Sequence, residues 1–139
     1  MDSNVVVAAE TLPATLEAVS HFVAGIESSF DTLDVSDRTG ITLALQELLV
    51  NIVVHAYAHL PGDIRVNIQM NDAMVNAVVE DDGPNAYDPE RLPKAPDPLD
   101  LQEHGMGMFI IQQTFDDVSY ARLNTVNHWH LSKRIGASR

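Results

Sequence analysis

The stretch LALQELLVNIVVHAY, residues 43–57, decides the fold of this 139-residue chain. Its apolar residues recur at steps of three and four, which is the spacing of a helix with one buried face. Together with Ile41, which lies just before this stretch, the apolar stripe consists of Ile41, Leu45, Leu48, Ile52 and Ala56. Ser36 is a good N-cap and Pro61-Gly62 ends the pattern, so we expect a core helix over about residues 36–58.

Three polar residues run along the same helix. Glu47, Asn51 and His55 follow one another at intervals of four, which places them on one ridge. That ridge lies beside the apolar stripe, where a carboxylate and a carboxamide are costly unless they contact a metal ion, water or a ligand. The helix alone leaves two interpretations open: polar contacts with neighbouring helices, or a ligand site.

The flanking segments predict the rest of the domain. Residues 63–71 alternate strictly between apolar and polar, and the Asn71-Asp72 turn joins them to a second strand over about residues 73–80. We expect a short first strand at residues 5–7, a helix over 106–117, and strands near 118–123 and 127–135. A further helix has the stripe Leu12, Leu16, Val19, Val23, Ile26 and Phe30. The prediction is one α+β domain over residues 1–139, a two-layer sandwich with helices on one face of a mostly antiparallel, mixed sheet.

Two glycine motifs border a proline-rich loop. Asp81-Asp82-Gly83 follows the second strand of the hairpin, and a carboxylate fixed there can accept a hydrogen bond from a ligand amino group. Gly105-Met106-Gly107-Met108 opens the next helix, where exposed N–H groups suit an anion. Each motif is weak alone. The long loop between them is typical of a functional lid or of a linker.

In this order and spacing, the motifs resemble the ATP-binding domain of the GHKL superfamily of gyrase, heat-shock chaperone and histidine-kinase ATPases. The chain is most similar in type to the stand-alone anti-sigma factor serine/threonine kinases. The likeness rests on residues 43–51 with His55-Ala56-Tyr57, on the D-x-G followed by Tyr87-Asp88-Pro89, and on the ending from Asn127 to Arg134. It covers nearly the whole chain.

The resemblance implies a role for each matching residue. Glu47 would be the general base that activates the attacking hydroxyl, and Asn51 would coordinate the Mg²⁺ that bridges the ATP phosphates. Asp81 would accept the adenine amino group above Gly83. The phosphate loop would consist of Gly105, Met106, Gly107 and Met108, with residues 84–104 as the nucleotide lid and His55 and Tyr57 in support.

The same resemblance implies a function and partners. We expect an ATP- and Mg²⁺-dependent serine/threonine kinase that sequesters a sigma factor and phosphorylates a small antagonist protein with a STAS domain, acting as a homodimer. Pro84-Asn85-Ala86 stands where many relatives have a second glycine, and Arg91 and Lys94 are the candidate cations of the lid. A nucleotide-responsive binding module without kinase activity is therefore the alternative. A fragment of a sensor histidine kinase is a third, weaker interpretation.

Charge and composition restrict the partners further. Eight basic residues stand against 20 acidic ones, a formal net charge of −12, which argues against nonspecific binding of a phosphate backbone. The chain has no cysteine, so disulfides and thiolate chemistry are excluded. We expect a cytoplasmic protein without a nucleic-acid or membrane partner. ATP is itself an anion, so its binding should depend strictly on Mg²⁺.

Overall fold

The computed structural model describes residues 4–87 and 106–136. The helices and strands along the chain are β1 (Val5–Pro13), α1 (Leu16–Ile26), α2 (Val35–Asn51), β2 (Asp63–Met70), β3 (Met74–Asp81), α4 (Met106–Thr114), β4 (Asp117–Leu123) and β5 (Val126–Arg134). A short 3₁₀ helix, Glu27–Phe30, follows α1, and a π-helix, Ile52–Ala56, continues α2. The elements expected from the sequence are all present in the order expected.

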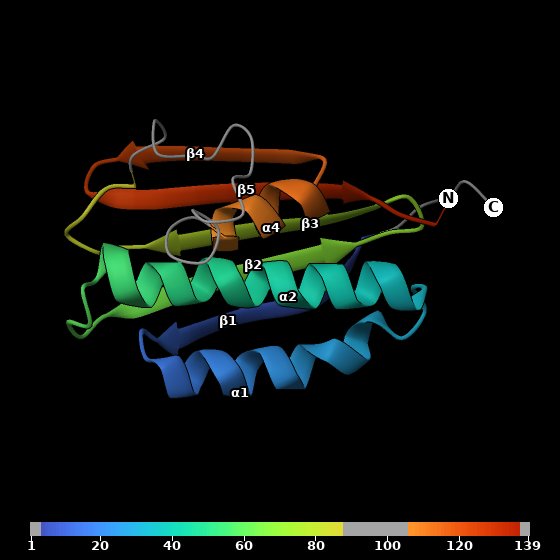
Figure 1. The fold of residues 1–139 in the computed structure, drawn as a ribbon, viewed down its shortest axis with the longest axis horizontal. Coiled ribbons are helices and arrows are strands. Elements are labelled where there is room, and N and C mark those ends of the chain that lie inside the picture. Colours follow the sequence, from blue (N-terminus) through green and yellow to red (C-terminus); the bar gives the residue numbers. More distant parts are fainter. Residues whose placement is uncertain (1–3, 88–105, 137–139) are drawn as a thin grey trace.

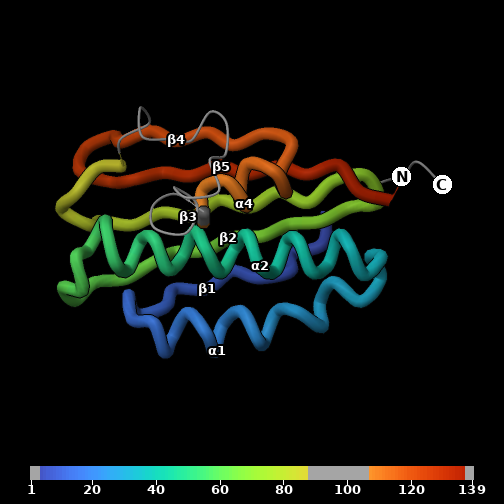
Figure 2. The backbone as a smooth tube through the Cα atoms, viewed as in Figure 1, coloured from blue at the N-terminus to red at the C-terminus, as the bar shows by residue number. Residues whose placement is uncertain are grey.

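The five strands form one sheet in the order β1-β2-β3-β5-β4, and every neighbouring pair is antiparallel. Helices α1, α2 and α4 lie together on one face of this sheet (Figure 1). Figure 2 shows that α2 runs back alongside α1 in the opposite direction. The α+β two-layer architecture is therefore confirmed, although the described sheet is wholly antiparallel and not mixed.

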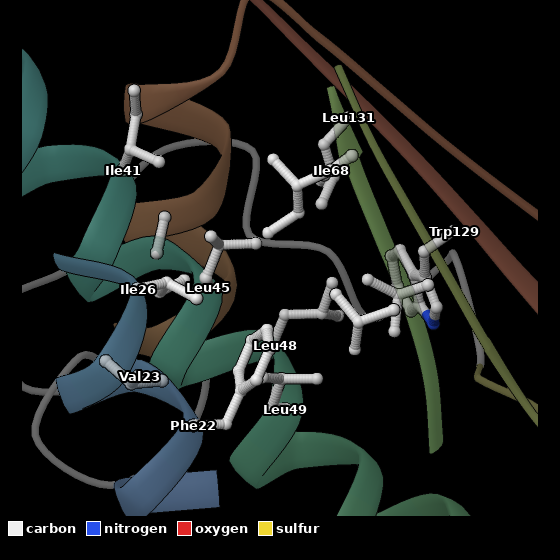
Figure 3. Close-up of a cluster of buried hydrophobic side chains, with 14 of the residues drawn as sticks. Phe22, Val23, Ile26, Ile41, Leu45, Leu48, Leu49, Ile68, Trp129 and Leu131 are labelled. Carbon is white, nitrogen blue, oxygen red and sulfur yellow. The ribbon is translucent and has the colours of Figure 1, made fainter. Parts of the chain in front are cut away.

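The core lies between the helices and the covered face of the sheet. In β2, Ile64, Val66 and Ile68 are buried, whereas the residues between them are exposed or half-buried. This is the alternation that the sequence predicted. Figure 3 shows how the helices meet the sheet through buried side chains, which include Phe22, Val23, Ile26, Ile41, Leu45, Leu48, Leu49, Ile68, Trp129 and Leu131.

The first strand is longer than predicted. It pairs with β2 from Val5 to Pro13, and Leu12 is buried as a strand residue rather than as the first member of the helical stripe. The helix starts only at Leu16 because the Thr15 side chain caps it, accepting a hydrogen bond from Ala18 N at 3.1 Å. The expected placement of Leu12 in the helix was wrong, because pairing with β2 satisfies the backbone of this segment.

The core helix also has a different cap. The Asp34 side chain, not Ser36, accepts the hydrogen bond from Asp37 N at 2.7 Å, so α2 begins at Val35. Among residues 4–87 and 106–136, Val35–Ala56 is the one helix long and apolar enough to cross a membrane by length and composition. Its buried residues, Ile41, Ala44, Leu45, Leu48, Leu49, Ile52 and Val53, belong to the core of the domain. The packing of a core helix accounts for this composition.

Candidate functional site

Glu47 and Asn51 lie one turn apart on α2, where the start of α4 packs against it. Both side chains are half-buried. A Cβ atom added to Gly107 would lie 2.8 Å from Glu47 Oε1 and 3.4 Å from Asn51 Nδ2. The missing side chain at position 107 therefore lets the first turn of α4 approach the two polar groups, and the structure brings these three predicted residues together.

This end of the site offers groups suited to a phosphate and a metal ion. In the part of the chain that the structure describes, neither Glu47 nor Asn51 uses its side chain in a hydrogen bond or an ion pair. The first N–H groups of α4 have no acceptor within their own helix. No three His, Cys, Asp or Glu side chains in the described ranges cluster as metal ligands. The site formed by Glu47, Asn51 and the start of α4 nevertheless fits Mg²⁺, because this ion is commonly held by one or two protein groups together with substrate phosphates.

The predicted phosphate-loop residues differ in what the structure shows of them. Met106 is the first residue of α4, and the Met108 side chain is buried in the core. A contact between Met108 and a phosphate would therefore use its backbone N–H group. Gly105, together with Arg91, Lys94 and most of the predicted lid, lies outside the described residues.

The end of α2 widens into a π-helix immediately after Asn51. A π-helical turn changes the direction in which later side chains project. The His55 side chain is exposed, whereas Glu47 and Asn51 are half-buried, so the polar ridge predicted for an uninterrupted α-helix does not continue to His55 in the same environment. Single π-turns inside helices are frequent at functional sites.

Tyr57 ties the helix end to the strand that carries the D-x-G motif. Its hydroxyl donates to the backbone oxygen of Asp63 and accepts a hydrogen bond from Asp82 N at 2.9 Å. Burial is the largest cause that raises the pKa of Tyr57. Gly62 is required beside the ring, because a Cβ there would lie 2.2 Å from Tyr57 Cε1. Tyr57 therefore supports the site structurally.

Asp81 is fully buried at the end of β3, and its two carboxylate oxygens differ. Oδ1 accepts hydrogen bonds from Gly83 N at 2.8 Å and from Asn127 Nδ2 at 2.9 Å. Oδ2 is buried and has no hydrogen-bond partner within the described residues. Burial is the largest influence on this group and raises the pKa of Asp81. A buried acceptor without a partner is costly, and a ligand amino group would satisfy it.

The neighbouring carboxylate has a different role. Asp82 is exposed and pairs with Arg65 Nη1 at 2.8 Å. This hydrogen bond is the main reason that the pKa of Asp82 is lowered. Of the two adjacent aspartates, Asp81 is therefore the one that keeps a buried oxygen without a partner in the described residues, and its contact with a ligand amino group stays a prediction.

Gly83 is held closely against the end of the π-helix. A Cβ atom at this position would lie 2.6 Å from the backbone oxygen of Ala56 and 2.7 Å from its carbonyl carbon. These are backbone atoms, which cannot move aside as a flexible side chain can. The resemblance places Gly83 beneath the adenine, and the structure adds a requirement for glycine that comes from the protein itself.

Asn85 fixes the segment after Gly83, in the stretch where many relatives carry a second glycine. Asn85 donates from its backbone N–H to Ala56 O at 3.1 Å and from Nδ2 to His55 O at 3.0 Å. These bonds satisfy carbonyl groups at the end of the helix. In the segment Pro84-Asn85-Ala86, Asn85 therefore caps the end of the π-helix.

The residues that hold Asp81 were not predicted from the sequence. Asn127 lies directly opposite Asp81 in the pairing of β3 with β5, and it is almost completely buried. Its Oδ1 accepts hydrogen bonds from the Tyr120 hydroxyl and from Arg122 Nη1. Only the register between strands far apart in the sequence brings these groups together. The polar residue Asn127 within an otherwise alternating strand is the one signal that the sequence contained.

Comparison with known families agrees with this geometry. The model of the family described as "Histidine kinase-like ATPase domain" matches residues 9–133. This range includes Glu47, Asn51 and Gly107 at one end of the site and Asp81 at the other. A search of curated proteins gave no match. The family implies ATP binding, and the free Asp81 Oδ2 and the glycine approach at residue 107 fit such a ligand. The chain thus belongs to the histidine kinase-like ATPase domain family.

Proposed function

We propose that this protein is an ATP-dependent serine/threonine kinase that acts as an anti-sigma regulatory factor. The observation that carries the proposal is the meeting of Glu47 and Asn51 with Gly107 at the start of α4. A base, a metal ligand and backbone N–H donors are the groups that phosphoryl transfer requires. The reaction depends on positioning and charge neutralisation more than on covalent chemistry by the protein.

Each group takes one part in the proposed reaction. Glu47 accepts the proton of the attacking serine or threonine hydroxyl, the hydroxyl oxygen forms a bond to the γ-phosphorus, and the bond from that phosphorus to the β,γ-bridging oxygen breaks. The Asn51 side chain contributes to holding Mg²⁺, which neutralises the phosphates when bound. The N-terminal turn of α4 supplies N–H donors to the phosphate oxygens. The products are a phosphoprotein and ADP.

The proposed partners follow from the resemblance to anti-sigma factor kinases and from charge. They are a sigma factor that is sequestered and a STAS-domain antagonist that is phosphorylated, with the kinase acting as a cytoplasmic homodimer. A net charge of −12 disfavours direct contact with nucleic acid, so any effect on transcription passes through proteins. The same charge makes Mg²⁺ necessary for binding ATP.

Phosphate transfer to a candidate STAS-domain antagonist tests the proposal. With [γ-³²P]ATP and Mg²⁺, the wild type should label that protein on serine or threonine. Glu47→Ala should lower the rate by about 10²- to 10⁴-fold, the usual contribution of a general base, while ATP binding is kept. Glu17→Ala, an exposed carboxylate in the first turn of α1, is the control for charge. Transfer by Glu47→Ala at the wild-type rate would refute the assignment.

A nucleotide-responsive binding module without kinase activity is the second candidate. The observation in its favour is the Asn85 cap, in the segment Pro84-Asn85-Ala86 where many relatives carry a second glycine. Such a module would bind Mg-ATP and its protein partner but would transfer phosphate to no partner. Nucleotide-dependent binding of a sigma factor in the absence of any labelling would support this candidate over the kinase.

A further inference from the structure

Arg122 lies beside Asp81 without touching it. The residue belongs to β4, where it faces Asn127 of β5 in the strand pairing, and it is half-buried. Its Nη1 donates to the Gly83 backbone oxygen at 3.0 Å and to Asn127 Oδ1 at 3.0 Å. One cation therefore holds both the backbone and the side chain that surround the buried carboxylate.

Arg122 fixes which way the Asn127 amide faces from one side, and the acceptors Asp81 Oδ1 and Asn85 O favour the same orientation from the other. An arginine side chain carries donors only, so the amide atom beside it must be the oxygen. The Asn127 Nδ2 group then points the other way and donates to Asp81 Oδ1 and to Asn85 O, at 2.9 and 3.2 Å. The Tyr120 hydroxyl also contacts Asn127 Oδ1. A hydroxyl can donate or accept, so Tyr120 alone would tolerate either orientation of the amide.

The orientation of the amide decides what Asp81 offers to a ligand. With N–H donors from Gly83 and Asn127 on Oδ1, the buried Oδ2 is the oxygen left to contact a ligand, and an ionised carboxylate only accepts. If the amide were reversed, its oxygen would face Oδ1. Two acceptors in contact repel each other unless a proton lies between them, and a protonated Asp81 could donate as well as accept.

We propose that Arg122 is a positioning residue that sets the base selectivity of the site. By fixing the Asn127 amide, it keeps Asp81 Oδ2 an acceptor for the 6-amino group of adenine and repels the 6-oxo group of hypoxanthine or guanine. The inference rests on the proposed binding of ATP at Asp81, and it adds the residue that determines which purine is accepted.

The electrostatic surroundings of Asp81 act in the same direction. Burial raises its pKa, and the neighbouring Asp82, which follows β3, raises it further, while the charge of Arg122 on β4 lowers it. The Tyr57 hydroxyl at the end of the helix and the Tyr120 hydroxyl on β4 also belong to the surroundings of Asp81 and Asn127. Removal of Arg122 therefore raises the pKa of Asp81 and increases the fraction of Asp81 that is protonated and able to donate a hydrogen bond.

Competition between two nucleotides tests the proposal. The dissociation constants of Mg-ATP and Mg-ITP are measured by calorimetry for the wild type, Arg122→Met and Arg122→Lys. Arg134→Met, an exposed arginine on β5, is the control for net charge. We expect Arg122→Met to weaken ATP about tenfold, as the loss of a charge-assisted hydrogen bond does. The dissociation constant of Mg-ITP should change by less than about threefold in the same variant. Arg122→Lys should retain part of the preference for ATP.

A purely structural role gives a different result. In that case Arg122→Met would weaken ATP and ITP by the same factor, and this outcome, or an unchanged ATP affinity, would overturn the proposal. If Arg122→Met does not fold, Arg122→Gln takes its place with the same expected directions, because glutamine lacks the charge and carries an acceptor as well as a donor.

A measurement without nucleotide separates this inference from the proposed function. The Asp81 carboxyl is followed by ¹³C NMR as the pH changes, and Arg122→Met should raise its midpoint while Arg134→Met leaves it in place. An equal midpoint in all three proteins would refute the role of Arg122. If the wild type binds no ATP, the proposed function fails, yet this titration still decides whether Arg122 controls Asp81.

Discussion

The two ends of the candidate site are built in opposite ways. At the Asp81 end, strands β3, β4 and β5 supply a closed hydrogen-bond network in which Asp81 and Asn127 are both almost fully buried. At the Glu47 end, helices α2 and α4 bring together half-buried side chains that bond to nothing else in the described ranges. The first end is fixed before a ligand arrives, and the second retains groups that can move toward a phosphate, a metal ion or a hydroxyl.

The two glycines show the same difference. A side chain at Gly83 would collide with backbone atoms of Ala56, whereas a side chain at Gly107 would first meet the carboxylate tip of Glu47. Backbone atoms constrain the first position, whereas the second is bordered by the side chain of the proposed general base. A site with a rigid end for recognition and an adjustable end for chemistry suits a reaction that depends on positioning.

The largest expected effect concerns the adjustable end and the Mg²⁺ proposed to bind there. Asn51→Ala should weaken binding of Mg-ATP by at least about 100-fold, since even groups that only support a metal ligand are worth 10- to 100-fold in affinity. EDTA should abolish ATP binding by the wild type. Calorimetry measures both, with Asn67→Ala on the exposed face of β2 as the control. Tight binding of ATP in EDTA would show that the protein alone neutralises the phosphates.

The glycines provide the next test of the comparison. Gly83→Ala should lower the free energy of unfolding by about 3 kcal/mol, because the added methyl group meets backbone atoms that cannot yield. Gly107→Ala should change it by less than about 1 kcal/mol, since the Glu47 side chain can rotate away and alanine favours the helix. Phosphate transfer by Gly107→Ala should nevertheless fall. Urea denaturation measures the stabilities.

Gly25→Ala is the matched control for this pair. Gly25 lies inside α1, and a Cβ atom there would meet nothing within 4 Å. The substitution should stabilise the protein by about 0.5–1 kcal/mol. Equal destabilisation by Gly83→Ala and Gly107→Ala would contradict the contrast between the two ends.

The raised pKa of Asp81 predicts how stability depends on pH. In the folded protein this carboxyl binds its proton more tightly than at the ordinary value of 3.8, so its contribution to stability is fully present below pH 3.8 and is lost as the pH rises through the folded pKa. Asp81→Asn removes that loss. The variant should gain stability relative to the wild type as the pH rises from 4 toward 7, as measured by urea denaturation. A constant difference over this range would show that Asp81 is not strained by ionisation.

The smallest effect is expected at the turn that joins the two strands of the rigid end. Asn124 and Thr125 connect β4 to β5 with φ values of 51° and 66°. A β-branched residue is disfavoured in this left-handed region, where glycine fits without strain. Thr125→Gly should raise the free energy of unfolding by about 1 kcal/mol and leave nucleotide selectivity unchanged, as thermal denaturation and calorimetry would show. A loss of stability would mean that the turn is not strained.

The sequence predicted those parts of the molecule that follow from local patterns. The stripe of α2, the alternation of β2 and the positions of Glu47, Asn51 and Asp81 all come from residue spacing within one segment. The π-helix was not predictable in this way, because it arises where the helix end packs on the segment after β3.

The network around Asp81 was hidden for a related reason. Asn127 and Arg122 reach Asp81 and Gly83 through the pairing of β3, β5 and β4, and neither residue belongs to a short motif. The end of β1 was misplaced because Leu12 fits both a strand that alternates and the start of a helical stripe. Only the long-range pairing with β2 decides between the two.

The most direct test of the account is the affinity of Asp81→Asn for two nucleotides. Asparagine keeps an oxygen for Gly83 and Asn127 but places an N–H donor where the ligand meets Oδ2. We predict that the variant loses affinity for Mg-ATP on the order of 100-fold, because a buried acceptor becomes a donor facing the adenine amino group. Its affinity for Mg-ITP should remain or improve. An unchanged affinity for ATP, with the fold intact by circular dichroism, would contradict the placement of the adenine at Asp81.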